Sequence, residues 1–144
     1  MRIAADVVID VHIDEVFEFV ANPLNDTRWC AKVVYVEQVE GDEPGPGAEY
    51  AVVHRPIPLR PPRRMRYVCV DWDPPNRIAW HEDDGHDVID VRYELGPVWT
   101  STRLTQTDTA QLGAPRLVKP LVKAAIRRDM TRQLRSLRRL LERA

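Results

Sequence analysis

The chain has 144 residues, of which 30% are charged and 44% hydrophobic, a length and composition typical of one globular domain spanning residues 1–144. Apolar runs of about 18 residues are absent, which argues against a membrane-spanning helix. The formal net charge is −1, which argues against an electrostatic nucleic-acid binder.

The location of the protein is predicted from its N-terminus and its thiols. Aspartates interrupt the apolar residues of "MRIAADVVIDVH", so this stretch makes a poor signal peptide. Cys30 and Cys69 show no spacing typical of a disulfide framework. We therefore expect reduced thiols and a cytoplasmic protein.

The first element in chain order is a strand over residues 3–11, because apolar residues alternate there with Asp6 and Asp10. A helix is expected next, over "DEVFEFVAN", with Asp14 as its N-cap. Asn22-Pro23 ends this helix, because the residue before proline avoids helical backbone angles. A short second helix or turn is predicted through "LNDTRWC".

Six strands are predicted in the middle of the chain, over residues 33–40, 49–55, 64–72, 77–82, 87–95 and 100–107. Segments rich in proline, glycine and aspartate separate them, as antiparallel hairpins require. The alternation between Asp87 and Leu95 indicates that one face of the sheet is exposed to water. Helices between these strands are not expected, so the predicted sheet is antiparallel.

The last predicted element is a long basic helix over residues 115–143, with one apolar stripe from Val118 to Leu141. Residues 114–144 hold 10 Lys and Arg against 2 Asp and Glu, whereas residues 1–113 hold 11 against 20. This helix is the only predicted element large enough to cover the buried face of the sheet. Its arginines fit a solvated outer face or ion pairs with the acidic sheet, and a transient contact with an anionic membrane surface is an alternative.

Four segments carry a resemblance to a known superfamily: "IDVHIDEVFEFVANPLNDTRW", "VDWDPPNRIAW", "TSTRLTQT" and "IRRDMTRQLRSLRRLLE". Together with the order β-α-α-β6-α, they are similar to the START-related, pollen-allergen-like superfamily, also called SRPBCC or polyketide cyclase/dehydrase. The resemblance implies an α+β helix-grip fold, in which a seven-stranded curved antiparallel sheet wraps around the C-terminal helix. It also implies an internal cavity for a small, mostly apolar molecule, opening near Ala124 and Ala125.

The most reactive stretch of the sequence is "HEDDGHD", residues 81–87. Asp84-Gly85 is a tight-turn dipeptide, and alternation sends His81 and Asp83 to the side opposite Glu82. A metal site needs three or four converging ligands. We therefore interpret the stretch as a solvated hairpin bend and expect neither a metal nor a cofactor.

Residues that share faces with the apolar stripes are the predicted ligand pocket: Trp29, His54, Tyr67, Cys69, Trp80, Val91, Tyr93, Thr102, Leu104, Val122 and Ile126. For each aromatic residue, packing in the core is the competing interpretation. For His54 the competing interpretation is a surface or hydrogen-bonded histidine.

Two functions follow from this pocket. The first is the binding of a small hydrophobic or amphipathic molecule without chemistry. The second is a polyketide cyclase, aromatase or dehydrase, which needs a base and a donor to an enolate. His54, Tyr67 and Tyr93 are its weak catalytic candidates, with Arg66 or Arg103 as oxyanion partners, and the spacing does not bring them together. The sequence leaves open whether the protein is an enzyme.

A third function is a protein-interaction module that uses the proline-rich loop, residues 56–62, and the basic helix. Four prolines stiffen this loop, and a rigid edge loop is its simplest interpretation. Nucleic acid is not expected as a partner, and either a monomer or a homodimer is compatible with the sequence.

Overall fold

The computed structural model describes residues 1–111 and 115–143. Its elements are β1 (Arg2–Ile9), α1 (Ile13–Val20), the 3-10 helix η1 (Pro23–Arg28), β2 (Val33–Glu40), β3 (Glu49–His54), β4 (Arg63–Asp73), β5 (Arg77–Asp83), β6 (Val88–Val98), β7 (Ser101–Ala110) and α2 (Lys119–Arg143). The predicted order is confirmed, and most predicted bounds lie within three residues of the observed ones.

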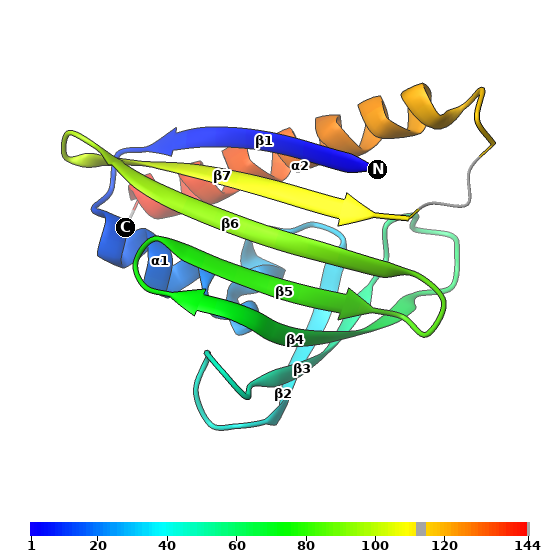
Figure 1. Ribbon diagram of the computed structural model, residues 1–144, viewed down its shortest axis with the longest axis horizontal. Helices are drawn as coiled ribbons and strands as arrows, with labels where there is room; N and C mark the ends of the chain where they lie inside the picture. The colour runs from blue at the N-terminus through cyan, green and yellow to red at the C-terminus, as the bar shows by residue number, and fades with distance from the viewer. Residues whose placement is uncertain (112–114, 144) are drawn as a thin grey trace.

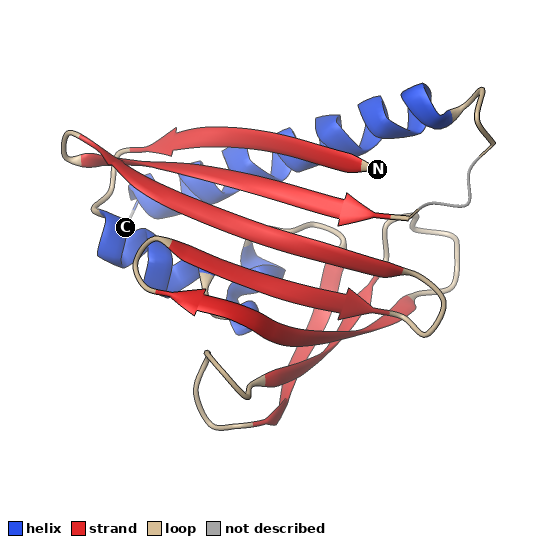
Figure 2. Ribbon diagram, in the orientation of Figure 1, coloured by secondary structure: helices blue, strands red, loops and turns tan. Residues whose placement is uncertain are grey.

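The seven strands form one antiparallel sheet in the order β1-β7-β6-β5-β4-β3-β2. The sheet curves, and α1, η1 and α2 lie on its concave side (Figures 1 and 2). Each strand pairs with its neighbour in sequence, except that β1 pairs with β7. The sheet around a long C-terminal helix is the predicted α+β arrangement.

The N-cap of α1 differs from the prediction. His12 caps the helix, with its ring Nδ1 accepting a bond of 3.3 Å from the backbone N–H of Asp14. Asp14 lies instead in the first turn, where a carboxylate favours the positive end of the helix dipole. The buried face of α1 consists of Val16, Phe17 and Val20, and the ring of Phe17 packs edge-on against Trp72 at 5.3 Å.

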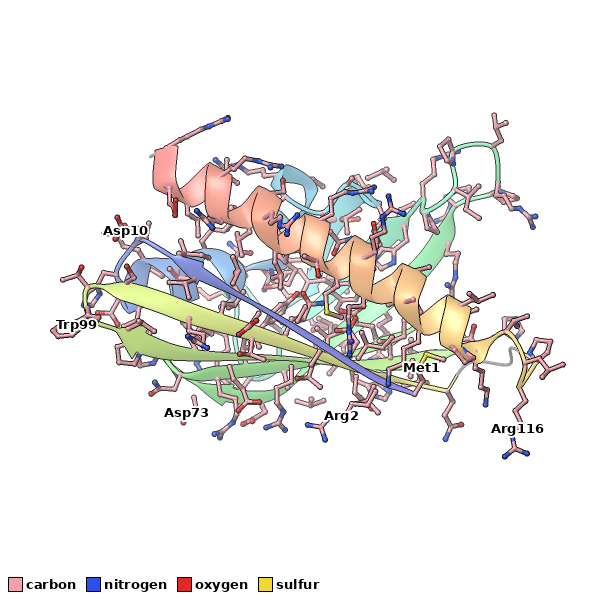
Figure 3. The ribbon with its side chains drawn as sticks, turned by 90° about the horizontal axis from the view of Figure 1, so that it is seen from above. Met1, Arg2, Asp10, Asp73, Trp99 and Arg116 are labelled. Atoms are coloured by element: carbon pink, nitrogen blue, oxygen red, sulfur yellow. The ribbon has the colours of Figure 1, made fainter. Side chains whose placement is uncertain are left out.

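The C-terminal helix begins four residues later than predicted, at Lys119. Residues 115–118 form a turn whose carbonyl at Pro115 accepts bonds from the N–H groups of Val118 and Lys119. Pro120 lies in the first turn of α2, where a missing N–H leaves no bond unmade. Figure 3 shows α2 running diagonally across the concave side of the sheet.

The two halves of α2 differ in burial. In the second half, Met130, Gln133, Leu134 and Leu137 are buried. In the first half, residues 119–129, Val122 and Ile126 are half-buried, whereas Leu121 is 72% exposed. Ala124 and Ala125 are also exposed. The helix therefore packs on the sheet mainly through its second half.

Candidate functional site

The interior has two ends, which the strand directions define. At one end β3, β5 and β7 finish and β1, β2, β4 and β6 begin; we call it the polar end. At the other end, the apolar end, lie fully buried aliphatic side chains, among them Ile9, Ile78, Leu104 and Leu137. Burial of these side chains from water contributes to the stability of the fold.

The polar end contains buried groups that can ionise. Asp26 from η1, His54 from β3 and Glu82 from β5 are each at most 9% exposed. Tyr67 from β4, opposite Glu82, is buried beside them, and Tyr93 from β6 is buried further along the sheet, opposite Ile78, within range of the charges of Asp26 and Glu82. We call these five residues the polar cluster. Five separate elements contribute to it, which is why no local sequence pattern marks it.

One short hydrogen bond joins two of the predicted site residues. The Nε2 atom of His54 lies 2.5 Å from the hydroxyl of Tyr67, and both side chains are buried. Burial lowers the pKa of His54 to about 3, with the positive charges of Lys32 and Arg63 adding to the shift. His54 is therefore neutral at physiological pH. It is also too weak a base for the role predicted for it.

Glu82 corrects the interpretation of "HEDDGHD" as an entirely solvated bend. Its side chain follows Ile78 and Trp80 on the inward face of β5 and is directly opposite Tyr67 on β4. Burial raises the pKa of Glu82 to about 8, and the nearby carboxyls of Asp108 and Asp26 act in the same direction. At neutral pH this carboxyl keeps its proton and can donate a hydrogen bond.

The rest of the stretch is the predicted bend. Asp84 Oδ1 accepts from the backbone N–H groups of His86 (2.8 Å) and Asp87 (2.7 Å). Gly85 takes a φ of 92°, which suits glycine. Arg63 forms ion pairs with Asp84 and Asp87. Over residues 1–111 and 115–143, groups of three or more His, Cys, Asp or Glu placed to hold a metal ion do not occur.

Asp26 is a second carboxyl that the sequence did not single out. Burial raises its pKa to about 8, while a hydrogen bond from the Trp29 side chain and the positive charge of Lys32 act in the opposite direction. Burial likewise raises the pKa of the neighbouring Cys30 thiol well above its usual range, so this cysteine is not an activated nucleophile. Lys32, which is half-buried, lowers the pKa of Asp26, Glu82 and His54. It is thus the cation shared by the polar cluster.

Two buried polar atoms lack a hydrogen-bond partner among the described residues: Tyr50 Oη and Gln106 Oε1. Trp29 packs edge-on against Tyr93 of the polar cluster at 6.4 Å. The amide of Gln106 donates to Asp108 at 3.0 Å and leaves its oxygen free. An unpaired buried polar atom costs about 1–3 kcal/mol. Such atoms are exceptions that point to water or a ligand as the missing partner.

The other predicted pocket residues lie in different surroundings. The hydroxyl of Thr102 donates to the carbonyl of Val11 at 2.8 Å, and Leu104 is fully buried at the apolar end. Trp80 packs edge-on against Tyr50, and Val91 is in the core. Cys69 is half-buried against the core. Val122 and Ile126 are half-buried on the first half of α2, at the polar end.

Neither predicted oxyanion partner reaches the interior. Arg66 is exposed and donates to Glu49 through two nitrogens, at 2.5 and 3.0 Å. Arg103 is exposed and lies 3.5 Å from Asp6. Both side chains alternate to the outer face of their strands, so the sheet itself separates them from Tyr67 and Tyr93.

Hollows on the protein surface are separate from the polar cluster. One, of about 600 Å³, is lined by residues of the β5–β6 turn and the end of β7, including His86, Asp87 and Gln111. Another, of about 650 Å³, includes the outward-facing Arg2, Asp90 and Arg92. Because Asp26, His54 and Glu82 are buried, a ligand reaches them only when the elements that cover them move.

The curved sheet, the long closing helix and the polar interior between them define a helix-grip protein. The sequence matches the family described as "Polyketide cyclase / dehydrase and lipid transport" over residues 1–142, and the chain belongs to this family. No curated protein matches the sequence. No helix in the described part of the chain is long and apolar enough to cross a membrane.

Solved structures similar to this chain share its fold at low sequence identity. A START superfamily protein from Mycobacterium smegmatis has a TM-score of 0.81 at 12% identity, covering 99% of this chain and 97% of that one. A Thermus thermophilus protein has a TM-score of 0.79 at 18% identity, covering 96% and 95%. BexL, a di-domain ARO/CYC of the BE-7585A biosynthetic pathway, has a TM-score of 0.77 at 18% identity, covering 99% of this chain and 46% of that one.

Proposed function

We propose that the protein binds a small molecule between the sheet and α2, and that this molecule has an apolar body and at least one hydrogen-bonding group. The observation that carries the proposal is the pair of unpaired buried polar atoms, Tyr50 Oη and Gln106 Oε1. A ligand hydroxyl or carbonyl would supply the missing partners, while the surrounding aromatic rings cover its apolar part.

The protonated carboxyls refine the class of ligand. Asp26 and Glu82 have pKa values raised to about 8, so each holds a proton at pH 7. A protonated carboxyl donates to a ketone or hydroxyl oxygen without placing a negative charge in the interior. This favours a neutral oxygen-bearing ligand, such as a phenol or polyketide-like ketone, over a plain hydrocarbon.

A matched pair of probes tests the proposal: 2-naphthol and naphthalene, which differ by one hydroxyl. Isothermal titration calorimetry should show tighter binding of 2-naphthol, by about tenfold for one buried hydrogen bond. Replacing Glu82 and Tyr67 together (Glu82→Leu with Tyr67→Phe) should remove this preference. The control Asp90→Asn changes a carboxyl on the outer face and should leave the preference unchanged. Equal affinities for the two probes, or no binding of either, would contradict the proposal.

A second function, acid–base catalysis of the cyclase or dehydrase type, is favoured by one observation, the pKa of about 8 for Glu82. A carboxyl with a pKa near neutrality can give and take a proton at working pH. Its neighbour Tyr67 is a donor suited to a developing enolate. Glu82 therefore replaces His54 as the acid–base candidate.

Single-turnover assays on a polyketide-like diketone would separate the two functions. In an enzyme, Glu82→Gln abolishes turnover while the affinity for 2-naphthol stays within a few-fold. A binding protein shows no turnover above the buffer rate, with either the wild type or the variant.

A further inference from the structure

Exposed apolar side chains gather at the polar end on two segments that are far apart in sequence. Leu59, in the proline-rich loop between β3 and β4, is 99% exposed, and Ile57 beside it is 52% exposed. Leu117 and Leu121, at the start of α2, are 93% and 72% exposed. Isolated surface leucines are ordinary, but here four exposed apolar side chains lie at one end of the protein, which makes this end a candidate contact surface.

The two segments project from the same end of the molecule. The proline-rich loop follows the end of β3, and the start of α2 follows the end of β7, and both strands finish at the polar end. In Figure 1 the β3–β4 loop and the first turn of α2 lie on the same side of the view. In Figure 3 Arg116 points away from the body at this end, opposite Asp10 and Trp99.

Positive charges accompany these leucines. Arg55 and Arg60 are exposed on the loop, and Arg116, Lys119 and Lys123 are exposed at the start of α2. The acidic residues of the neighbouring β5–β6 turn, Asp84 and Asp87, form ion pairs with Arg63. The surface therefore combines apolar side chains with a local excess of cations. We call Ile57, Leu59, Leu117 and Leu121, with their five cations, the docking patch.

We propose that the docking patch binds the surface of an anionic lipid bilayer. Lysine and arginine are attracted to anionic headgroups, and leucines beside them enter the boundary between headgroups and acyl chains. Nucleic acid would use the cations but leave the leucines in water. The bilayer is thus the partner whose chemistry matches both halves of the patch.

The patch lies at the polar end, beside the first half of α2. Docking would place this weakly packed half of α2, and the loop opposite it, at the bilayer surface. The proposal does not depend on the interior ligand, because the patch consists of exposed residues outside the polar cluster.

Vesicle co-sedimentation tests the proposal with the full chain and no added ligand. The protein should sediment with vesicles of phosphatidylglycerol and phosphatidylcholine, and much less with phosphatidylcholine alone. Binding should weaken as sodium chloride is added, since salt screens the cations. If the wild type does not bind the anionic vesicles, the proposal is overturned, and a protein or nucleic-acid partner becomes the occupant to seek.

Paired variants locate the contact. Leu59→Ser with Leu121→Ser should lower the vesicle partition coefficient by ~10-fold or more, because two apolar side chains are lost. The control Val70→Ser with Trp99→Ser removes side chains that are 59% and 97% exposed elsewhere, and should change it less than ~2-fold. Equal effects of the two pairs would overturn the proposal. All four positions are exposed, so circular dichroism should report an unchanged fold.

Charge reversal on one helix completes the test. Lys119→Glu with Lys123→Glu should abolish binding to the anionic vesicles. Arg132→Glu with Arg135→Glu changes the same number of charges at exposed positions in the second half of α2. This variant should retain most of the binding to anionic vesicles. If both reversals abolish binding equally, binding depends on the total positive charge of α2 and not on the docking patch, and the proposal is overturned. Affinity for 2-naphthol in solution should be unchanged throughout, which separates failure of this proposal from failure of the interior site.

Discussion

The two ends of the interior are built from the same strands but filled with different chemistry. At the apolar end, Ile9, Ile78 and Leu137 are completely buried, and α1 closes the sheet through Phe17 and Trp72. At the polar end, carboxyls, an imidazole and phenols occupy equivalent inward positions, and the helix above them is half exposed. Fully buried aliphatic packing and the candidate site therefore lie at opposite ends of the strands. Four experiments test this contrast between the two ends.

The largest expected effect is at the apolar end. Leu134→Ala should lower the free energy of unfolding by about 3 kcal/mol, since it empties a fully packed site. Leu121→Ala, on the exposed half of the same helix, should change it by less than about 0.5 kcal/mol. Urea unfolding monitored by circular dichroism gives both values. Similar losses for the two variants would show that the halves of α2 do not differ in packing.

The next effect concerns Glu82 and depends on pH. Between pH 4.5 and 8 the unfolded chain loses this proton while the folded protein keeps it, so stability should fall as pH rises. Glu82→Gln removes this contribution, although Asp26 retains its own. The free energy of unfolding of the variant should equal that of the wild type near pH 4 and should be larger at pH 8, by on the order of 2–3 kcal/mol. If the difference in stability between the variant and the wild type does not change with pH, the Glu82 carboxyl is exposed to solvent and this prediction is wrong.

His54 should act with the opposite sign. Its pKa is lowered to about 3, so below pH 6.5 the imidazole binds a proton in the unfolded chain but not in the folded protein. Stability contributed by neutral His54 is therefore lost as pH falls from about 6.5. The free energy of unfolding of His54→Gln, relative to that of the wild type, should rise by about 2 kcal/mol when the pH is lowered from 7 to 5. Urea titrations at the two pH values measure this difference, and an unchanged difference would contradict the burial of His54.

The smallest effect is expected on the outer face. Arg66→Ala breaks the exposed ion pair with Glu49 and should change the free energy of unfolding little, and less still in high salt. The probe affinities should not change, because the sheet separates Arg66 from the polar cluster. A loss of 2-naphthol binding in this variant would return Arg66 to the role of an oxyanion partner.

Much of the fold could be predicted from the sequence because each strand and helix has its own period. The alternation from Asp87 to Leu95 and the stripe from Val118 to Leu141 fix both element type and buried face. The start of α2 could not be located, because the stripe continues through residues 115–118, which form only a turn. Likewise, the sequence pointed to Asp14 as the cap of α1, and the imidazole of His12, two residues earlier, takes this role.

The candidate site was only partly predictable. His54, Tyr67 and Tyr93 share faces with apolar neighbours, and the structure joins His54 to Tyr67 by a hydrogen bond while Tyr93 is buried further along the sheet. Glu82 showed the same pattern, since positions 78, 80 and 82 share one face of the strand, but the acidic residues around it suggested a solvated turn. Asp26 carried no signal, because its burial depends on how η1 packs against β2.

Lys32 gives the interior a collective behaviour. One half-buried ammonium group acts at once on Asp26, Glu82, Asp108 and His54, so their protonation equilibria are linked and not independent. Neutralising that ammonium, by acetylation for example, would raise the proton affinity of all four groups together. A single covalent change would then shift the protonation of all four groups in the same direction.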